Sequence, residues 1–328
     1  MKKTLLALCC AVVSFSALAK TELTVYTIIE PELLNTYKTE FEKANPDIEI
    51  NWIRDSTGVI TAKLLAEKEN PKADVAFGVA ASSLLIFDKE GMLLPYKPKG
   101  YDLLSSQMKD DNIPPHWVGT NAWATSLCIN KFVMKKHNLP YPKTWQDLTN
   151  PIYKGLIAAP NPASSGSGFM NISAWIQMWG EKKAWAYQDA LNKNIKMYTH
   201  SGSKPCSMAA QGEVAIGLSS SSFAHTLIKR RAPIDLVIPE GGIGWDMEAA
   251  AIIKGTKHLE AAKKLVDWVS SDDVAKIGAV FSGIPSREEF ITSEGKISYN
   301  AMIKNNFKWA ANNRSTLIQQ WRDKYELN

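Results

Sequence analysis

Strand-like and helix-like segments alternate between residues 22 and 92, and this alternation limits the possible folds more than any other feature of the chain. The segments ELTVYTII (22–29), IEINWIR (48–54) and ADVAFGV (73–79) have the composition and apolar pattern of strands. Each strand-like segment is followed by a segment with apolar residues at helical spacing, at 31–46, 55–71 and 81–92. In two cases a short loop comes before the helical spacing begins. Strands that alternate with helices in this way predict an α/β fold with a parallel sheet.

The second half of the chain predicts a second unit of the same kind. AWATSLCIN (122–130) is typical of a strand that crosses to another lobe, and WDMEAAAIIKG (245–255) of the return. A chain of this length exceeds what one hydrophobic core usually holds. We therefore expect residues 20–122 and 248–328 to form lobe 1 and residues 123–247 to form lobe 2. The crossing strands would act as a hinge, with a cleft between the lobes.

The amino terminus has the pattern of a cleavable secretory signal peptide. Lys2 and Lys3 precede an apolar run over residues 5–13, and small residues lead to Ala17-Leu18-Ala19. Removal of residues 1–19 lowers the formal net charge from +5 to +3. The remaining basic residues are interleaved with acidic ones, which excludes the clustered charge of a nucleic-acid-binding protein.

Two cysteines, Cys128 and Cys206, remain after the predicted cleavage. An oxidising compartment favours a disulfide between them, but two buried thiols that act as small apolar side chains are an alternative. The sequence does not give the separation of their Cα atoms, so both interpretations stay open. Two cysteines without further ligands at suitable spacing do not make a zinc site.

Three predicted strand-to-helix junctions carry hydroxyl residues next to glycine. Free backbone N–H groups and the positive end of a helix dipole suit an anion, and glycine permits a close approach. Each junction alone fits an ordinary helix N-cap equally well. All three lie at the ligand-binding edge of a sheet, which favours an oxyanion with several oxygens. The residues are Ser56, Thr57 and Gly58, then Ser165, Gly166 and Ser167, then Ser201, Gly202 and Ser203.

Acidic and aromatic residues fall at the same predicted edges and could receive a cation. Glu30 follows the first strand, Trp123 lies in the crossing strand, and Asp246 and Glu248 lie where the chain returns. A carboxylate pairs with an ammonium, and a tryptophan face adds a cation–π attraction. Core packing for Trp123 and a solvated or capping carboxylate for the acids are the alternatives. Two further serines, Ser82 and Ser221, are candidate hydroxyl ligands at neighbouring loops.

An enzymatic interpretation starts from Ser201-Gly202-Ser203-Lys204, which matches the S-x-x-K element of serine acyl-transfer enzymes. The companion elements of that class are absent from the sequence in the required order, and Pro205 follows at once. The chain also lacks a G-x-S-x-G elbow and a G-x-x-x-x-G-K phosphate loop. An anion-binding role is therefore favoured over catalysis.

Four stretches together resemble the periplasmic 2-aminoethylphosphonate-binding proteins of ABC importers, within the iron and polyamine group of type II periplasmic binding proteins. The likeness covers about residues 23–264. The stretches are DSTGVITAKLLAEKENPKADV, NPASSGSGF, YTHSGSKPCSMAAQGE and GWDMEAAAIIKGT.

This resemblance implies a monomer in the periplasm that closes on a zwitterion and delivers it to an inner-membrane permease without chemistry and without a cofactor. The phosphonate would lie among the nine residues of the three hydroxyl-rich junctions, with His200 as a further donor. Strand-end packing is the alternative role of His200. The ammonium would meet Glu30, Asp246 or Glu248.

The segment GLSSSSFAHT (217–226) departs from this resemblance because it is unusually rich in serine. Extra hydroxyl groups would suit a sugar phosphate, so this class of ligand remains an alternative. Ferric iron is less favoured, because Phe223 and His225 stand where iron-binding relatives have adjacent tyrosines. Polyamines are a further, weaker alternative.

Overall fold

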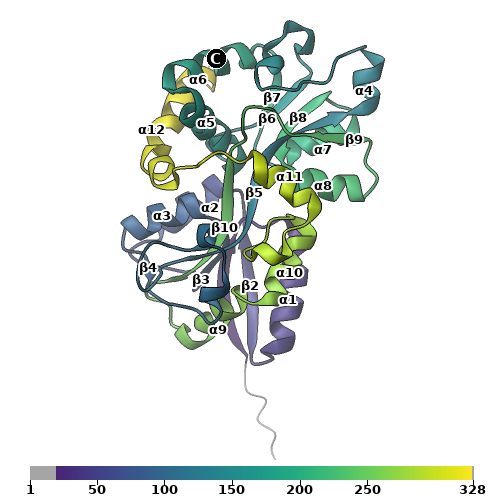
Figure 1. The fold of residues 1–328 in the computed structure, drawn as a ribbon. Coiled ribbons are helices and arrows are strands. Elements are labelled where there is room, and N and C mark those ends of the chain that lie inside the picture. The colour runs from purple at the N-terminus through teal and green to yellow at the C-terminus, as the bar shows by residue number, and fades with distance from the viewer. Residues whose placement is uncertain (1–19, 327–328) are drawn as a thin grey trace, which may run out of the picture.

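The computed structural model describes residues 20–326, so the predicted signal peptide lies outside the described residues. Ten strands form one continuous sheet in the order β2-β1-β3-β10-β5-β8-β6-β7, with β4 beside β10 and β9 beside β5. Helices cover the sheet in two lobes, which are joined in the middle by β5 and β10 (Figure 1). The α/β fold with two lobes and crossing strands is as the sequence predicts.

Lobe 1 contains the alternating elements predicted from residues 22–92. Its strands β1, β2 and β3 are parallel, because each is followed by a helix that returns the chain to the starting edge. The elements are β1 (Thr21–Thr27), α1 (Pro31–Ala44), β2 (Ile48–Arg54), α2 (Thr57–Ala66), β3 (Val75–Ala80), α3 (Ala81–Lys89) and β4 (Leu93–Leu94). The later helices α9 (Leu259–Val269) and α10 (Asp272–Phe281) follow the return of the chain.

Lobe 2 repeats this plan with shorter strands. Strand β6 pairs in parallel with β7 and β8, and each is followed by a helix. The elements are α4 (Lys131–Lys136), β6 (Ile157–Pro160), α5 (Gly166–Trp179), α6 (Glu181–Asn192), β7 (Ile195–Thr199), α7 (Lys204–Gln211), β8 (Ile216–Ser220), α8 (Ser221–Lys229) and β9 (Ile234–Val237).

Strands β5 (Val118–Asn130) and β10 (Trp245–Ile253) belong to both lobes. Residues 118–124 of β5 pair with β10, and residues 125–130 pair with β8 and β9. The boundaries predicted from the sequence, after residues 122 and 247, fall within these two strands. The division into lobes at those residues stays a prediction.

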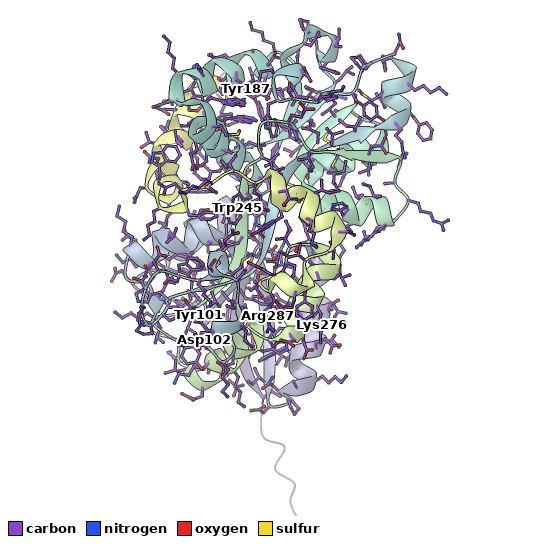
Figure 2. The ribbon with its side chains drawn as sticks, in the orientation of Figure 1. Tyr101, Asp102, Tyr187, Trp245, Lys276 and Arg287 are labelled. Carbon is purple, nitrogen blue, oxygen red and sulfur yellow. A yellow bond between two sulfur atoms is a disulfide. The ribbon has the colours of Figure 1, made fainter. Side chains whose placement is uncertain are left out.

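The carboxy-terminal segment contacts both lobes, whereas the sequence placed it in lobe 1. It contains α11 (Ser293–Ala301) and α12 (Phe307–Tyr325), and α12 packs against α3 of lobe 1 and α5 of lobe 2 (Figure 1). Trp245, at the start of β10 in the middle of the molecule, holds the segment that precedes α12 (Figure 2). Its Nε1 donates to the carbonyl of Ile303 at 2.8 Å, and its ring meets Phe307 edge to face.

Cys128 of β5 and Cys206 of α7 form a disulfide within lobe 2. Their Cα atoms are 5.3 Å apart, and both side chains are fully buried in a small apolar cluster. The bond ties α7 to the crossing strand. It thereby fixes the position of the loop that precedes α7. No helix within residues 20–326 has the length and apolar character needed to cross a bilayer.

Candidate ligand-binding site

A cavity of about 80 Å³ lies between the lobes, and we call it the serine cavity. A cavity that holds a single water needs only about 10–15 Å³, so this space suits a small ligand. Most of its lining comes from four loops that each lead into a helix. These residues are Ser56 and Thr57; Ser165, Gly166 and Ser167; Ser201, Gly202 and Ser203; Ser220 and Ser222. Ile28, Glu30, Arg54, Trp123 and Glu248 complete it.

The amino termini of α2, α5, α7 and α8 therefore converge on one space. The first turn of each helix has N–H groups without partners inside the helix, and the helix dipole adds partial positive charge there. Ser165 and Ser220 cap their helices by accepting from Gly168 N and Phe223 N. Within residues 20–326, Ser56 does not use its hydroxyl as a cap of α2. Its hydroxyl can therefore serve a ligand.

A further donor in the lining is the indole of Trp123 on β5. The residue is 7% exposed, and among the described residues its Nε1 has no hydrogen-bond partner. A buried donor that is left unpaired costs free energy, on the order of 1–3 kcal/mol. A ligand oxygen in the serine cavity would satisfy it.

Two glycines let loops of the site approach each other, one between the lobes and one within lobe 2. A Cβ at Gly166 would lie 2.5 Å from Oγ1 of Thr57, which belongs to the other lobe. At Gly202 it would lie 2.6 Å from Oγ of Ser167. Any side chain at either position would displace neighbouring atoms or fill the space between the lobes. These glycines are therefore required by close contact and not only by chain flexibility.

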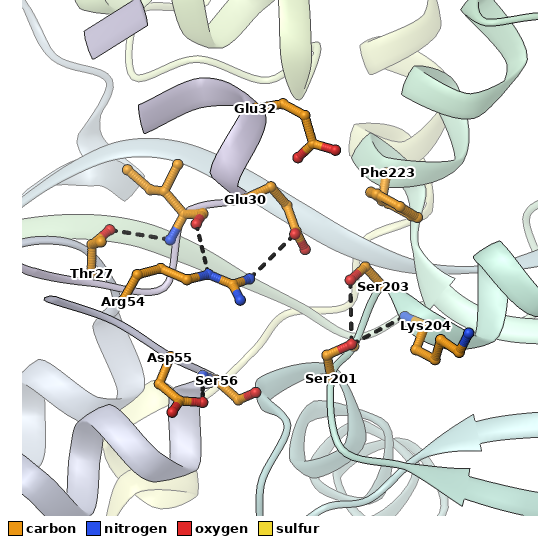
Figure 3. Close-up of polar contacts among 12 residues, drawn as sticks. Thr27, Glu30, Glu32, Arg54, Asp55, Ser56, Ser201, Ser203, Lys204 and Phe223 are labelled. Atoms are coloured by element: carbon orange, nitrogen blue, oxygen red, sulfur yellow. Dashed lines mark hydrogen bonds and ion pairs between the residues drawn. The ribbon is translucent and has the colours of Figure 1, made fainter. Parts of the chain in front are cut away.

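One cation, Arg54, reaches the cavity from the end of β2. Its Nε donates to the carbonyl of Ile29 at 3.2 Å, and its Nη2 donates to Glu30 Oε2 at 3.3 Å (Figure 3). Glu30 is the N-cap residue of α1, which begins with Pro31. Burial raises the pKa of Glu30, while Arg54 and a hydrogen bond with Ser203 oppose the rise. Glu30 and Arg54 therefore form an ion pair at the wall of the cavity.

The second carboxyl of the lining belongs to Glu248 on β10. Burial raises its pKa to about 8, a hydrogen bond with Asn121 opposes the rise, and the charge of Glu30 adds to it. At neutral pH and without a ligand, Glu248 therefore holds a proton for most of the time. In this form it can donate a hydrogen bond, whereas a nearby cation would favour its ionised form.

Eleven of the sixteen residues predicted from the sequence line the serine cavity, and Ser82 and Asp246 do not. Ser82 is 3% exposed, and its hydroxyl donates to Oδ2 of Asp246, which is 6% exposed. Burial raises the pKa of Asp246 to about 6, and hydrogen bonds from Ser82 and from the N–H of Met247, together with Arg314, limit the rise. Arg314 comes from α12, in the segment that the sequence assigned to lobe 1. Asp246 is thus paired with protein groups behind the cavity.

The other three predicted residues that lie outside the cavity are Gly58, His200 and Ser221. Gly58 N donates to the carbonyl of Ser164 at 2.8 Å, and a Cβ there would overlap the carbonyl oxygen of Ala163. His200 is exposed and pairs with Asp55 at 3.3 Å. Gly58 and His200 therefore hold the lobes together instead of facing the ligand. Ser221 is buried, and its neighbours Ser220 and Ser222 line the cavity instead.

Sequence analysis missed four lining residues, Ile28, Arg54, Ser220 and Ser222. Arg54 is the last residue of a strand that the sequence did predict, at the edge where ligands bind. Its position at that edge could therefore have identified Arg54 as a candidate ligand-binding residue. The two serines belong to the run at 219–222, where the sequence showed unusual hydroxyl content but not which serines would face inward.

The contacts of Lys204 do not support acyl transfer at Ser201. The contact between the two residues runs from the backbone N of Lys204 to Oγ of Ser201 at 3.3 Å, and the Lys204 side chain is exposed (Figure 3). A general base would have to place its own nitrogen at the nucleophile. Nor do three His, Cys, Asp or Glu side chains gather anywhere in residues 20–326 to hold a metal ion.

Residues 27–276 match the family of bacterial extracellular solute-binding proteins. The chain belongs to this family. It is 33% identical over 270 residues to an uncharacterised protein of Haemophilus influenzae, an alignment that covers 80% of this chain and 76% of that one. A probable ABC transporter periplasmic-binding protein of Sinorhizobium fredii is 26% identical, with 85% and 79% covered. The protein is therefore a solute-binding component of an ABC importer, which acts outside the cytoplasm with a membrane permease.

Two further similarities concern ligands. A putative 2-aminoethylphosphonate-binding periplasmic protein of Salmonella typhi is 23% identical, with 87% of this chain and 84% of that one covered. The periplasmic binding protein AfuA of Actinobacillus pleuropneumoniae, solved with fructose-6-phosphate, is 26% identical with a TM-score of 0.86. That alignment covers 94% of this chain and all of the other. The family and the fold are thus shared with proteins of differing ligands.

Proposed function

We propose that this protein captures a small organic phosphonate or phosphate in the periplasm and delivers it to its permease. The observation that carries the proposal is the convergence of four helix amino termini and Arg54 on one cavity. An oxyanion with three free oxygens could accept from several of these donors at once. The unpaired Nε1 of Trp123 adds a buried donor to the same set.

The first candidate ligand is 2-aminoethylphosphonate, as the sequence predicts. Its phosphonate would lie among the hydroxyl-rich loops, and its ammonium would meet Glu30 and Glu248. The two carboxyl groups in the lining support this candidate, because an ammonium between them would pair with Glu30 and favour the ionised form of Glu248.

A hexose phosphate is the second candidate. The hydroxyl groups of Ser220 and Ser222 in the lining and the fructose-6-phosphate found in AfuA support it. A protonated Glu248 would donate to a sugar hydroxyl, and Glu30 would accept from another. This candidate requires no cation in the ligand.

The proposed class is tested with mature protein that has been unfolded, washed free of ligand and refolded. A ligand that binds only the native state raises the melting temperature by mass action. We expect stabilisation by an organic phosphate or phosphonate, and loss of this shift in Ser56→Ala combined with Ser167→Ala. Stabilisation only by spermidine or ferric citrate would contradict the proposal.

Proton release separates the two candidates. An ammonium beside Glu248 lowers the pKa of this group from about 8, so binding of 2-aminoethylphosphonate at pH 7 should release protons. A hexose phosphate should leave Glu248 protonated. Calorimetry in two buffers of different ionisation enthalpy measures this difference, and Glu248→Gln should abolish the release.

A further inference from the structure

A second hollow of about 50 Å³ adjoins the serine cavity, and the two share Glu30, Ser222 and Glu248 as lining residues. We call it the aromatic chamber. Leu33, Tyr37, Phe223 and Phe281 supply apolar surface, and Asn121 and Ser282 are among its polar residues. Figure 3 shows Phe223 on the far side of Glu30 from Arg54. The space exceeds what a water requires, and its aromatic lining suits carbon atoms better than water.

The shared wall carries little free negative charge. Glu30 is paired with Arg54 at 3.3 Å, and burial together with the Glu30 charge keeps Glu248 protonated at neutral pH. Glu32, which also borders the chamber, pairs with Arg230 at 3.6 Å. An uncharged group can therefore enter the chamber without leaving a buried charge unpaired.

The chamber is formed by both lobes. Leu33 and Tyr37 come from α1 of lobe 1, Phe223 comes from α8 of lobe 2, and Phe281 ends α10. Tyr37 is fixed in the core by edge-to-face contacts with Phe77 and Trp268. Phe223 is half-buried, and it shares this lining with residues of lobe 1. Because both lobes supply the wall, we expect closure to shape the chamber around any ligand group that extends past Glu30 and Glu248.

We infer that the aromatic chamber binds an uncharged ring in the organic part of the ligand, and that Phe223 determines this specificity. The inference rests on the proposed function, because the phosphate or phosphonate of the same ligand would occupy the serine cavity. Within the proposed class it decides against 2-aminoethylphosphonate, the first candidate, and favours a longer ligand in which a sugar or aromatic ring packs against Phe223.

Titration calorimetry of the refolded mature protein with four probes tests the inference. The probes are inorganic phosphate, 2-aminoethylphosphonate, fructose 6-phosphate and phenyl phosphate. We expect at least one ring phosphate to bind more tightly than the two smaller probes. Phe223→Ala should lower the affinity for that ring phosphate roughly tenfold and change the affinity for inorganic phosphate less than about twofold. Comparison of the two ring phosphates identifies the kind of ring.

Phe132→Ala is the matched control, because Phe132 is 69% exposed on α4, in the same lobe. It should leave every affinity unchanged, and circular dichroism checks that both variants fold. Tighter binding of 2-aminoethylphosphonate than of both ring phosphates would overturn the inference, as would equal weakening of phosphate and ring phosphate in Phe223→Ala. Failure of all four probes to bind would instead overturn the proposed function, and the inference with it.

Discussion

The two lobes present different chemistry to the serine cavity. Lobe 1 contributes the ionisable groups of Arg54, Glu30 and Glu248 and the amino terminus of one helix, α2. Lobe 2 contributes no charged residue to this lining but the amino termini of three helices, α5, α7 and α8. Charge is thus concentrated on one side of the ligand, and neutral donors are concentrated on the other.

This difference suggests a division of roles during binding. The charges of Arg54 and Glu30 offset each other at long range, so lobe 1 does not steer an anion from solution. It instead places one cation and two carboxyl groups where they can distinguish the ends of a bound ligand. The serine loops of lobe 2 act at hydrogen-bond distance and become effective when the lobes close. Ser203 of lobe 2 also contacts Glu30 of lobe 1, which joins the two sides directly.

The largest effect is expected from removal of the disulfide that ties α7 to β5 in lobe 2. Replacing Cys128 and Cys206 together with alanine should lower the free energy of unfolding by about 2–4 kcal/mol, because the reduced chain gains conformational freedom in the unfolded state. Urea denaturation with and without reductant measures the change. Reductant should destabilise the wild type and leave the double variant unaffected. A loss below about 0.5 kcal/mol would contradict the stabilising role of the bond.

Removing the cation of lobe 1 should have the next largest effect. Arg54→Met keeps much of the side-chain length but loses the charge and its donors. We expect a loss of about 2–3 kcal/mol in the binding of the phosphorylated ligand, since hydrogen bonds to charged groups have this size. Calorimetry measures it. Arg231→Asn removes an exposed arginine at a positive φ of 61°, which asparagine tolerates, and should bind normally.

A steric change at the contact between the lobes should have a smaller effect. Gly166→Ala places a Cβ 2.5 Å from Thr57 Oγ1, so complete closure requires atoms to move. We expect roughly tenfold weaker binding, comparable with the cost of overpacking. Small-angle scattering should show a smaller compaction on ligand addition. Thr57→Ala removes the nearest atom but also a hydroxyl of the site, so the double variant should lose less affinity than the sum of the two single losses. Additive losses would contradict a steric cause.

The smallest effect is expected on the stability of the ligand-free protein, from the protonation of Glu248 in lobe 1. The pKa of Glu248 is about 8 in the folded protein and ordinarily 4.5, so the folded state binds more protons between these pH values. Stability should therefore fall as pH rises from about 4.5 to 8. Glu248→Gln should remove this fall and be more stable at pH 8, on the order of 1 kcal/mol.

Asp246 provides an internal reference for that experiment. Its pKa is raised from 3.8 to about 6, so both proteins should lose stability as pH rises through this lower range. Thermal denaturation from pH 4 to 9 separates the two contributions. Identical profiles for wild type and Glu248→Gln would contradict the raised pKa of Glu248.

The fold was predictable because its periodic signals are strong and local. The segment IEINWIR has the same bounds as β2, and the predicted helical segment 31–46 contains α1. Serine and glycine at three junctions also predicted one site, since the carboxyl ends of parallel strands meet at one edge of a sheet. The structure brings residues of these three junctions to the serine cavity.

The prediction failed where distant segments decide a side chain's partner. Asp246 accepts a hydrogen bond from Ser82 and lies within the electrostatic influence of Arg314, and the position of α12 could not be read from local pattern. Arg54 was overlooked because a charged residue at the end of a strand is usually solvated. The aromatic chamber depends on α1, α8 and α10 meeting in space, which no short motif encodes.

The position of α12 has a consequence for how the lobes can separate. A helix that stays in contact with two rotating bodies must lie close to the axis of their rotation, where displacement is smallest. Because α12 packs on both α3 and α5, we expect the axis to pass near this helix and the strands β5 and β10. Contacts farther from that line move through longer arcs. Rotation about such an axis would part Arg230, at the end of α8, from Glu32 of α1 while the carboxy-terminal helix keeps its place.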